Sequence, residues 1–150
     1  MHKADLFRCG IGMASLAAGT AVYVCCRQDA VAVQRLFVTE WLDAVRIEPP
    51  DDSTIAGYVL LYCLPDALWY LALLLMQTAI CRAGSAWGKS ILWFSVLLPF
   101  AWEAMQLAGM IGGWFDAMDI VFYVLVLIVL WINDKKFCCL LGKWQSLRHL

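Results

Sequence analysis

The chain has 150 residues, of which 63% are hydrophobic and 15% are charged, whereas soluble domains average about 45–50% apolar and about 25% charged residues. This composition argues against a water-soluble protein, and the mean hydropathy of +0.74 indicates that the lipid bilayer is the partner of most of the surface. A net charge of -1 does not indicate the basic surface that binds nucleic acid, so we expect no nucleic-acid partner. The length predicts a single membrane domain over residues 1–150.

Four apolar windows are long enough to be membrane-spanning helices, because the hydrocarbon layer is about 30 Å thick and a helix rises about 1.5 Å per residue. They cover residues 9–26, 57–81, 90–107 and 118–132. Pro65 and Asp66 interrupt the second window, which predicts either a kink or a helix start preceded by a shallower segment. We therefore predict an all-α integral membrane fold with four transmembrane helices.

A fifth segment, residues 30–48, carries apolar side chains at helical spacing with charged residues between them. This pattern is typical of an amphipathic interfacial helix, which would lie on the membrane surface or cover the mouth of the bundle. Pro49 and Pro50 end it, because proline disfavours helix in the preceding residue and has no amide hydrogen to donate.

The basic residues predict the orientation of the chain, because cytoplasmic loops are enriched in Lys and Arg. If the N-terminus is cytoplasmic, most of the basic residues fall on the inner side and only Arg27, Arg35 and Arg46 on the outer side. We therefore expect a multi-pass protein whose N-terminus and C-terminus are both cytoplasmic, with residues 109–117 forming an outer turn.

The seven cysteines show no C-x-x-C motif and no paired Cys and His spacing, so their pattern gives little support to a zinc or redox site. A disulfide from Cys25 or Cys26 to Cys63 is an alternative if these residues face an oxidising compartment. His2 and His149 lie near the two ends and no nucleophile motif accompanies them, so we assign no catalytic residues.

The most informative residues are acids inside apolar windows. Glu103 lies in the third window, where a carboxylate near the bilayer centre costs about 2.5–3.5 kcal/mol. Gln106 shares its helix face. Asp116 and Asp119 enter the fourth window from the same side, and Asp66 lies in the second. We expect these residues to meet near the outer face of the membrane.

Several kinds of partner could compensate such acids: protonation, hydrogen bonds from Gln106, Tyr62, Tyr70 or Tyr123, an arginine such as Arg46, or a bound cation. A structural alternative is that Asp66, Asp116 and Asp119 only begin helices, where the macrodipole favours acids. The predicted ligand-binding residues are Glu103, Gln106, Asp116, Asp119, Asp66 and Tyr123. The cofactor is not predicted beyond a divalent cation, for which Glu103, Asp116 and Asp119 are the candidate ligands.

Residues 99–106, with the pattern E-x-x-Q, and residues 113–119, with F-D-x-x-D, together resemble the VanZ-like family of small bacterial membrane proteins. Gly113 and Trp114 stand where an arginine often precedes the F-D pair in that family. Tyr123 and Val126 stand where many members have Asn and Gly. The resemblance implies a bacterial inner-membrane location, a cell-envelope role and a link to low-level glycopeptide antibiotic resistance.

From these observations we expect an envelope factor, more consistent with a binding protein than with an enzyme, that binds an amphiphile or a lipid-linked headgroup at an acidic pocket of the outer leaflet. A metal-dependent enzyme acting on a lipid phosphate is one alternative. Another is a structural subunit that packs against a membrane partner, or against a second copy of itself, through the small residues Gly10, Ala14 and Ala18.

Overall fold

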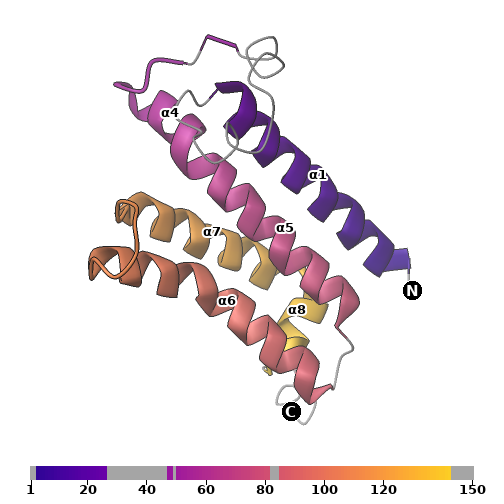
Figure 1. Ribbon diagram of the computed structural model, residues 1–150. Coiled ribbons are helices and arrows are strands. Elements are labelled where there is room, and N and C mark those ends of the chain that lie inside the picture. Colours follow the sequence, from indigo (N-terminus) through magenta and orange to yellow (C-terminus); the bar gives the residue numbers. More distant parts are fainter. Residues whose placement is uncertain (1–2, 27–46, 49, 82–84, 143–150) are drawn as a thin grey trace, which may run out of the picture.

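The structure, a computed structural model, describes residues 3–26, 47–48, 50–81 and 85–142. Every element in these ranges is a helix and none is a strand, which confirms the all-α prediction. The elements in chain order are α1 (Lys3–Cys26), α4 (Ile55–Tyr58), η1 (Val59–Cys63), α5 (Leu64–Ile80), α6 (Ala86–Leu107), α7 (Ala117–Asn133) and α8 (Lys135–Leu140). Figure 1 shows α5 running through the middle of the bundle, with α1 on one side of it and α6 and α7 on the other.

Three helices are long and apolar enough to cross a membrane: α1, the continuous helix Ile55–Ile80 and α6. α7 is also apolar, but its 17 residues extend only about 25 Å. Its described surface exposes Val121, Leu125 and Ile128, as expected for a helix that contacts lipid rather than water. The chain therefore has the helices of a membrane protein.

α1 begins at Lys3, six residues before the predicted apolar window. The charges of Asp5 and Arg8 end the apolar window, but they do not interrupt the backbone hydrogen bonds of the helix. The two side chains form an ion pair across one turn, with Arg8 Nη1 3.0 Å from Asp5 Oδ1. The start of the apolar stretch is therefore not the start of the helix.

The helix passes through Pro65 without ending. A proline within a helix lacks an amide hydrogen and crowds the carbonyl four residues earlier. Here the turn before it widens into the π-helix η1, and the amide of Leu64 donates to the carbonyl of Val59, five residues back. The predicted irregularity at Pro65 is thus a π-helical turn, and Asp66 lies in the first turn of α5.

α1 packs along α5 through a face of small buried residues, Gly12, Ser15 and Gly19. The row formed by Gly10, Ala14 and Ala18 is exposed instead. The main core lies where α5 meets α6, α7 and α8, and it includes Leu74, Leu92 and Phe137.

One end of the bundle is held by four charged side chains, Asp5, Arg8, Asp134 and Lys136, which we call the ion-pair cluster. Arg8 binds both carboxylate oxygens of Asp134, at 2.6 and 2.8 Å. Lys136 Nζ donates to Asp5 Oδ1 at 2.8 Å and to the carbonyl of Ala79 at 3.1 Å. The cluster therefore joins α1 to α5 and to the junction of α7 and α8.

Asp134 also caps α8, because its Oδ1 accepts hydrogen bonds from the amides of Lys136 and Phe137. Burial raises the pKa of the Asp134 carboxyl, but the hydrogen bonds from Arg8 and the two amides outweigh burial and leave this pKa below its ordinary value of 3.8. Asp134 is therefore held as a carboxylate. The short helix α8 was not predicted from the sequence.

Of the amphipathic helix predicted over residues 30–48, the structure describes only Ile47 and Glu48, which are not helical. The rest of that prediction lies outside the described residues. The amide of Ile47 donates to the carbonyl of Cys25 at 2.9 Å, which brings this point of the chain back to the end of α1.

Candidate functional site

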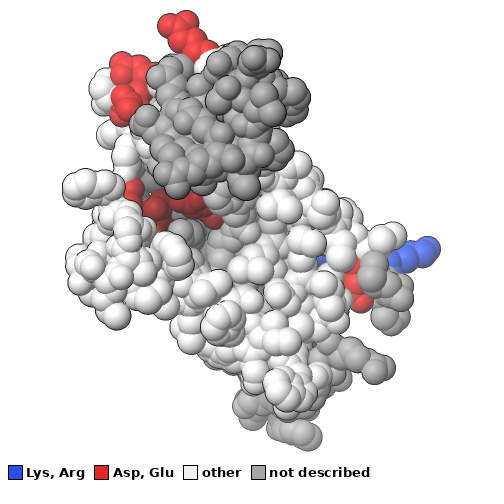
Figure 2. Space-filling model, viewed as in Figure 1, with Lys and Arg blue, Asp and Glu red and all other residues white. Residues whose placement is uncertain are grey.

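A cavity of about 810 Å³ opens at the end of α7 opposite the ion-pair cluster. Figure 2 shows acidic side chains inside a hollow on this face of the molecule. The cavity contains all six predicted site residues, which come from α5, α6 and the start of α7. The described residues that line it are Tyr23, Tyr58, Tyr62, Asp66, Trp69, Trp102, Glu103, Gln106, Gly113, Trp114, Phe115, Asp116, Asp119 and Tyr123.

The lining is acidic. Asp66, Glu103, Asp116 and Asp119 contribute four carboxyl groups, and no Lys or Arg is among the described residues that line the cavity. The sequence predicted that acids from three separate windows would lie at neighbouring depths, and the structure brings them to one cavity.

Glu103 is the most deeply buried of the four acids, with 4% of its surface exposed. Its Oε2 accepts a hydrogen bond of 3.2 Å from the backbone amide of Asp116. Glu103 therefore joins α6 to the residue that precedes α7.

Asp116 is the N-cap of α7. Its Oδ1 accepts from the amide of Met118 at 2.8 Å, and its Oδ2 accepts from the hydroxyl of Tyr58. This is the capping geometry that the structural alternative predicted for Asp116. The second bond reaches across to α4, so the carboxylate is fixed from two elements.

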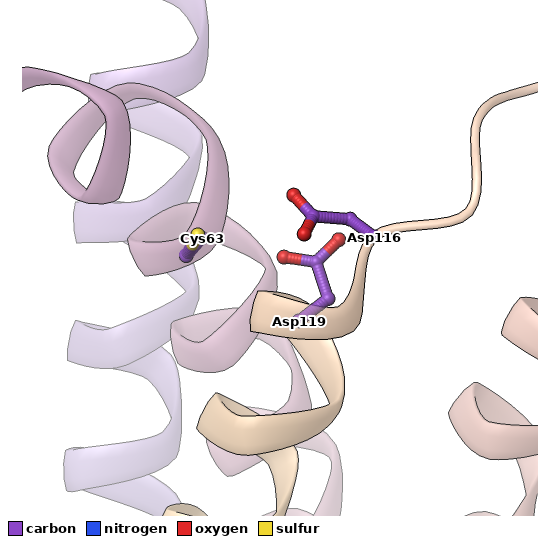
Figure 3. A group of neighbouring side chains, drawn as sticks. All are labelled: Cys63, Asp116 and Asp119. Atoms are coloured by element: carbon purple, nitrogen blue, oxygen red, sulfur yellow. The ribbon is translucent and has the colours of Figure 1, made fainter. Parts of the chain in front are cut away.

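Asp119 lies in the first turn of α7 and points toward Asp116 and Cys63 (Figure 3). The ligand atoms of Cys63, Asp116 and Asp119 all lie within 4.8 Å of one another. Asp119 is half-buried as a residue, and its Oδ1 atom is buried. All seven cysteines are free thiols, so the structure does not contain the disulfide between Cys63 and Cys25 or Cys26.

Two buried oxygens at this cavity accept no hydrogen bond from any described residue: Oε1 of Gln106 and Oδ1 of Asp119. A buried acceptor without a donor costs about 1–3 kcal/mol, so such atoms are rare in native structures. Since both atoms are acceptors, the complementary group is a hydrogen-bond donor or a cation.

Tyr123 lines the cavity, and its ring packs against two other aromatic rings. Its ring lies edge-on to Tyr70 at 5.2 Å and to Phe100 at 5.9 Å. The hydroxyl of Tyr70 donates to the carbonyl of Val96 at 3.0 Å, and the hydroxyl of Tyr62 lies 3.5 Å from Asp52 Oδ2. Tyr58, which the sequence analysis did not single out, donates to a cavity carboxylate, that of Asp116.

An apolar groove of about 330 Å³ lies between α5 and α6, next to the cavity. The two hollows share Asp66, Trp69, Trp102 and Tyr123 in their linings, so they adjoin. Beyond these shared residues the groove is lined by Tyr70, Leu73, Leu98 and Pro99. A polar cavity and an apolar groove thus adjoin on the bundle.

The structure groups potential metal ligands differently from the sequence prediction. The prediction combined Glu103, Asp116 and Asp119, whereas the compact group in the described residues has Cys63 with the two aspartates. Sequence reasoning considered Cys63 only as a disulfide partner of Cys25 or Cys26, because the cysteines show no metal-ligand spacing along the chain.

Comparisons of the chain with protein-family models, with curated proteins and with solved structures found no match, so the site is interpreted from its own geometry.

Proposed function

We propose that this chain is a four-helix integral membrane protein that binds an amphiphile, with the headgroup in the acidic cavity and the hydrocarbon chain in the groove between α5 and α6. The proposal rests on one observation: the two hollows adjoin. They share the lining residues Asp66, Trp69, Trp102 and Tyr123. Their volumes, about 810 and 330 Å³, are in the range of small-molecule sites in proteins.

The polarity of the cavity supports a headgroup that carries hydrogen-bond donors, such as an ammonium group or several hydroxyls. Four carboxyl groups disfavour a headgroup with net negative charge. The unpartnered acceptors of Gln106 and Asp119 match N–H or O–H donors. In this proposal Glu103 anchors the headgroup while Gln106 orients it.

The resemblance of residues 99–106 and 113–119 to VanZ-like proteins supports a place in the bacterial inner membrane and an effect on glycopeptide susceptibility. α7 serves as the fourth span in this proposal, and the turn between α6 and α7 faces outward. Labelling of Gly112→Cys by an impermeant reagent from the outside tests that orientation, and labelling only after permeabilisation would contradict it.

The ligand proposal can be tested by native mass spectrometry of the purified chain with lipids that have the same acyl chains. Phosphatidylethanolamine presents an ammonium group with donors, whereas phosphatidylcholine presents a cation without donors. We expect the ethanolamine lipid to be retained about tenfold better, because a hydrogen bond to a charged group contributes about 1.5–3 kcal/mol. Phosphatidylglycerol should bind most weakly.

Two variants separate the parts of the site. Glu103→Gln should reduce the preference for the ethanolamine lipid, and Leu98→Trp should fill the groove and reduce the retention of every lipid. Asp51→Asn is the matched control, because it removes an exposed acid that does not line the cavity. Equal retention of the three lipids, or unchanged selectivity in Glu103→Gln, would contradict the proposal.

A further inference from the structure

We infer that Cys63, Asp116 and Asp119 form a binding site for a divalent transition-metal ion of the zinc class, with one coordination position open to the cavity. This inference goes beyond the proposed function and does not require an amphiphile to be bound. The site combines residues from two helical elements: the thiol comes from η1, and the two carboxylates come from the N-cap and the first turn of α7.

The geometry of the three ligand atoms is close to what a metal ion needs. They lie within 4.8 Å of one another, and the ligands of a tetrahedral zinc ion with bonds of about 2.0–2.3 Å are roughly 3.5 Å apart. Side-chain rotations that move each atom by about 1 Å would therefore close the group around the ion. Figure 3 shows that the two carboxylates already point toward each other.

A second observation points independently to a ligand. The buried Oδ1 of Asp119 has no hydrogen-bond donor among the described residues, and the Asp119 carboxylate points toward Asp116 and Cys63 (Figure 3). Two carboxylates buried side by side are unfavourable unless a proton, a hydrogen-bond donor or a cation compensates their charge. A metal ion would satisfy this oxygen and the charge of the pair together.

The surroundings of the group resemble the second layer of residues that orients metal ligands in proteins. Ligating carboxylates are usually hydrogen-bonded by neighbouring groups that fix their direction. Here Tyr58 and the amide of Met118 hold the two oxygens of Asp116. Glu103 accepts a hydrogen bond from the backbone amide of Asp116, so it helps to fix the position of Asp116.

The donor set selects the class of metal. Mg²⁺ and Ca²⁺ prefer oxygen ligands only, whereas a thiolate favours zinc and related ions. Cys63 is fully buried, with 0% of its surface exposed, so its sulfur is available to the cavity group and not to solvent. Three protein ligands leave a fourth tetrahedral position, which is the arrangement of zinc sites that also bind water or a substrate group.

The test is a titration of the purified, chelator-treated full chain in detergent with Co²⁺, without added lipid. We expect one equivalent of Co²⁺ to produce a thiolate-to-cobalt charge-transfer absorption, which Zn²⁺ then abolishes by displacement. Cys63→Ser should lose the absorption. Asp119→Asn should weaken binding by at least about 100-fold, since losing even an indirect partner of a metal site costs about 10- to 100-fold.

The control is Cys81→Ser, because Cys81 is also buried but lies at the other end of α5. It should keep the absorption and the affinity. Thermal unfolding is the second measurement: Zn²⁺ should raise the melting temperature of the wild type and of Cys81→Ser, but not that of Asp119→Asn. An absorption that persists in Cys63→Ser, or an equal affinity in Asp119→Asn, would overturn the inference.

The metal and lipid proposals fail in different ways. Loss of the cobalt signal in the wild type would overturn the metal site alone, because the lipid measurement can be made in the presence of a chelator. Equal retention of the three lipids, with a normal cobalt signal, would overturn the amphiphile proposal alone.

Discussion

Gly113 is a single residue whose lack of a side chain shapes the cavity. Its φ of +125° lies in a region that residues with a Cβ rarely adopt. A Cβ at this position would also collide with the side-chain amide of Gln106. Gly113 therefore allows the turn after α6 to lie directly over the residue that presents an unpartnered acceptor to the cavity.

Gly113→Ala should destabilise the fold by about 1–3 kcal/mol through backbone strain. It should also reduce the retention of phosphatidylethanolamine, because Gln106 must move. Gly112→Ala is the matched control, since a Cβ there meets nothing within 4 Å. Thermal unfolding and native mass spectrometry check both effects, and similar behaviour of the two variants would refute the role given to Gly113.

At the scale of single residues, the acids could be predicted because a carboxylate in an apolar helix is unusual whatever the fold. Tyr58 and Cys63 could not, because tyrosine and cysteine are ordinary in such helices. Their importance depends on the π-helical turn η1, which sets the direction in which the residues before Pro65 point. The spacing rules for zinc sites do not indicate the proposed metal site, because Cys63 lies far in the sequence from Asp116 and Asp119.

Among the helices, α1 and α5 make the closest contact. A Cβ at Gly19 would lie 2.9 Å from Trp69 Cδ1 and 3.0 Å from the carbonyl oxygen of Pro65. The indole of Trp69 also donates to the hydroxyl of Thr20 at 3.2 Å. Since Trp69 lines the cavity, the packing of α1 reaches the site through this side chain.

Gly19→Ala should separate the two helices and destabilise the protein by about 1–3 kcal/mol, as overpacked substitutions do. Gly10→Ala on the same helix should be neutral or should stabilise it by up to about 1 kcal/mol, because its position is open and alanine favours helix. The melting temperatures of the two variants in detergent provide the measurement. A fall of equal size in both would show that helix propensity, and not close packing, is responsible.

At the scale of elements, apolar windows located all the long helices, because burial in lipid or protein depends on the same side chains. The bounds at the charged ends were less accurate, as Lys3 shows, since charges end an apolar window without ending a helix. The sequence indicated a small-residue face made of Gly10, Ala14 and Ala18 with Ser15 and Gly19 on the adjoining row, and α1 packs on α5 through that adjoining row together with Gly12. Periodicity identified small residues without showing which row faces α5.

Across the whole molecule, the two ends of the bundle differ in how their acids are compensated. At the acidic cavity, carboxylates face one another with few donors among the described residues. At the other end, Asp5 and Asp134 are bound by Arg8 and Lys136. The second end is therefore compensated within the chain, whereas the first has the unpartnered acceptors on which the proposed binding of a ligand depends.

The ion-pair cluster predicts how stability depends on pH. The pKa of Asp134 is lower in the folded chain than its ordinary value of 3.8, so its contribution is complete above that value and is lost as the pH falls through the folded pKa. Asp134→Asn should be less stable by about 1–3 kcal/mol at neutral pH. Below pH 3.8 its stability should decline less than that of the wild type.

Chemical denaturation in detergent across this acidic range checks the prediction. Asp52→Asn serves as the control, because Asp52 is exposed and lies outside the ion-pair cluster. It should follow the wild type at every pH. A parallel pH dependence in wild type and Asp134→Asn would show that other groups govern acid stability.

The bond between Arg8 and Asp134 joins residues that are 126 positions apart. During synthesis Arg8 is therefore made long before Asp134, so α1 can pack on α5 early but forms this ion pair only after α7 is complete. Nascent chains that stop before residue 134 lack this closing contact and should be recognised by quality-control proteases as incomplete.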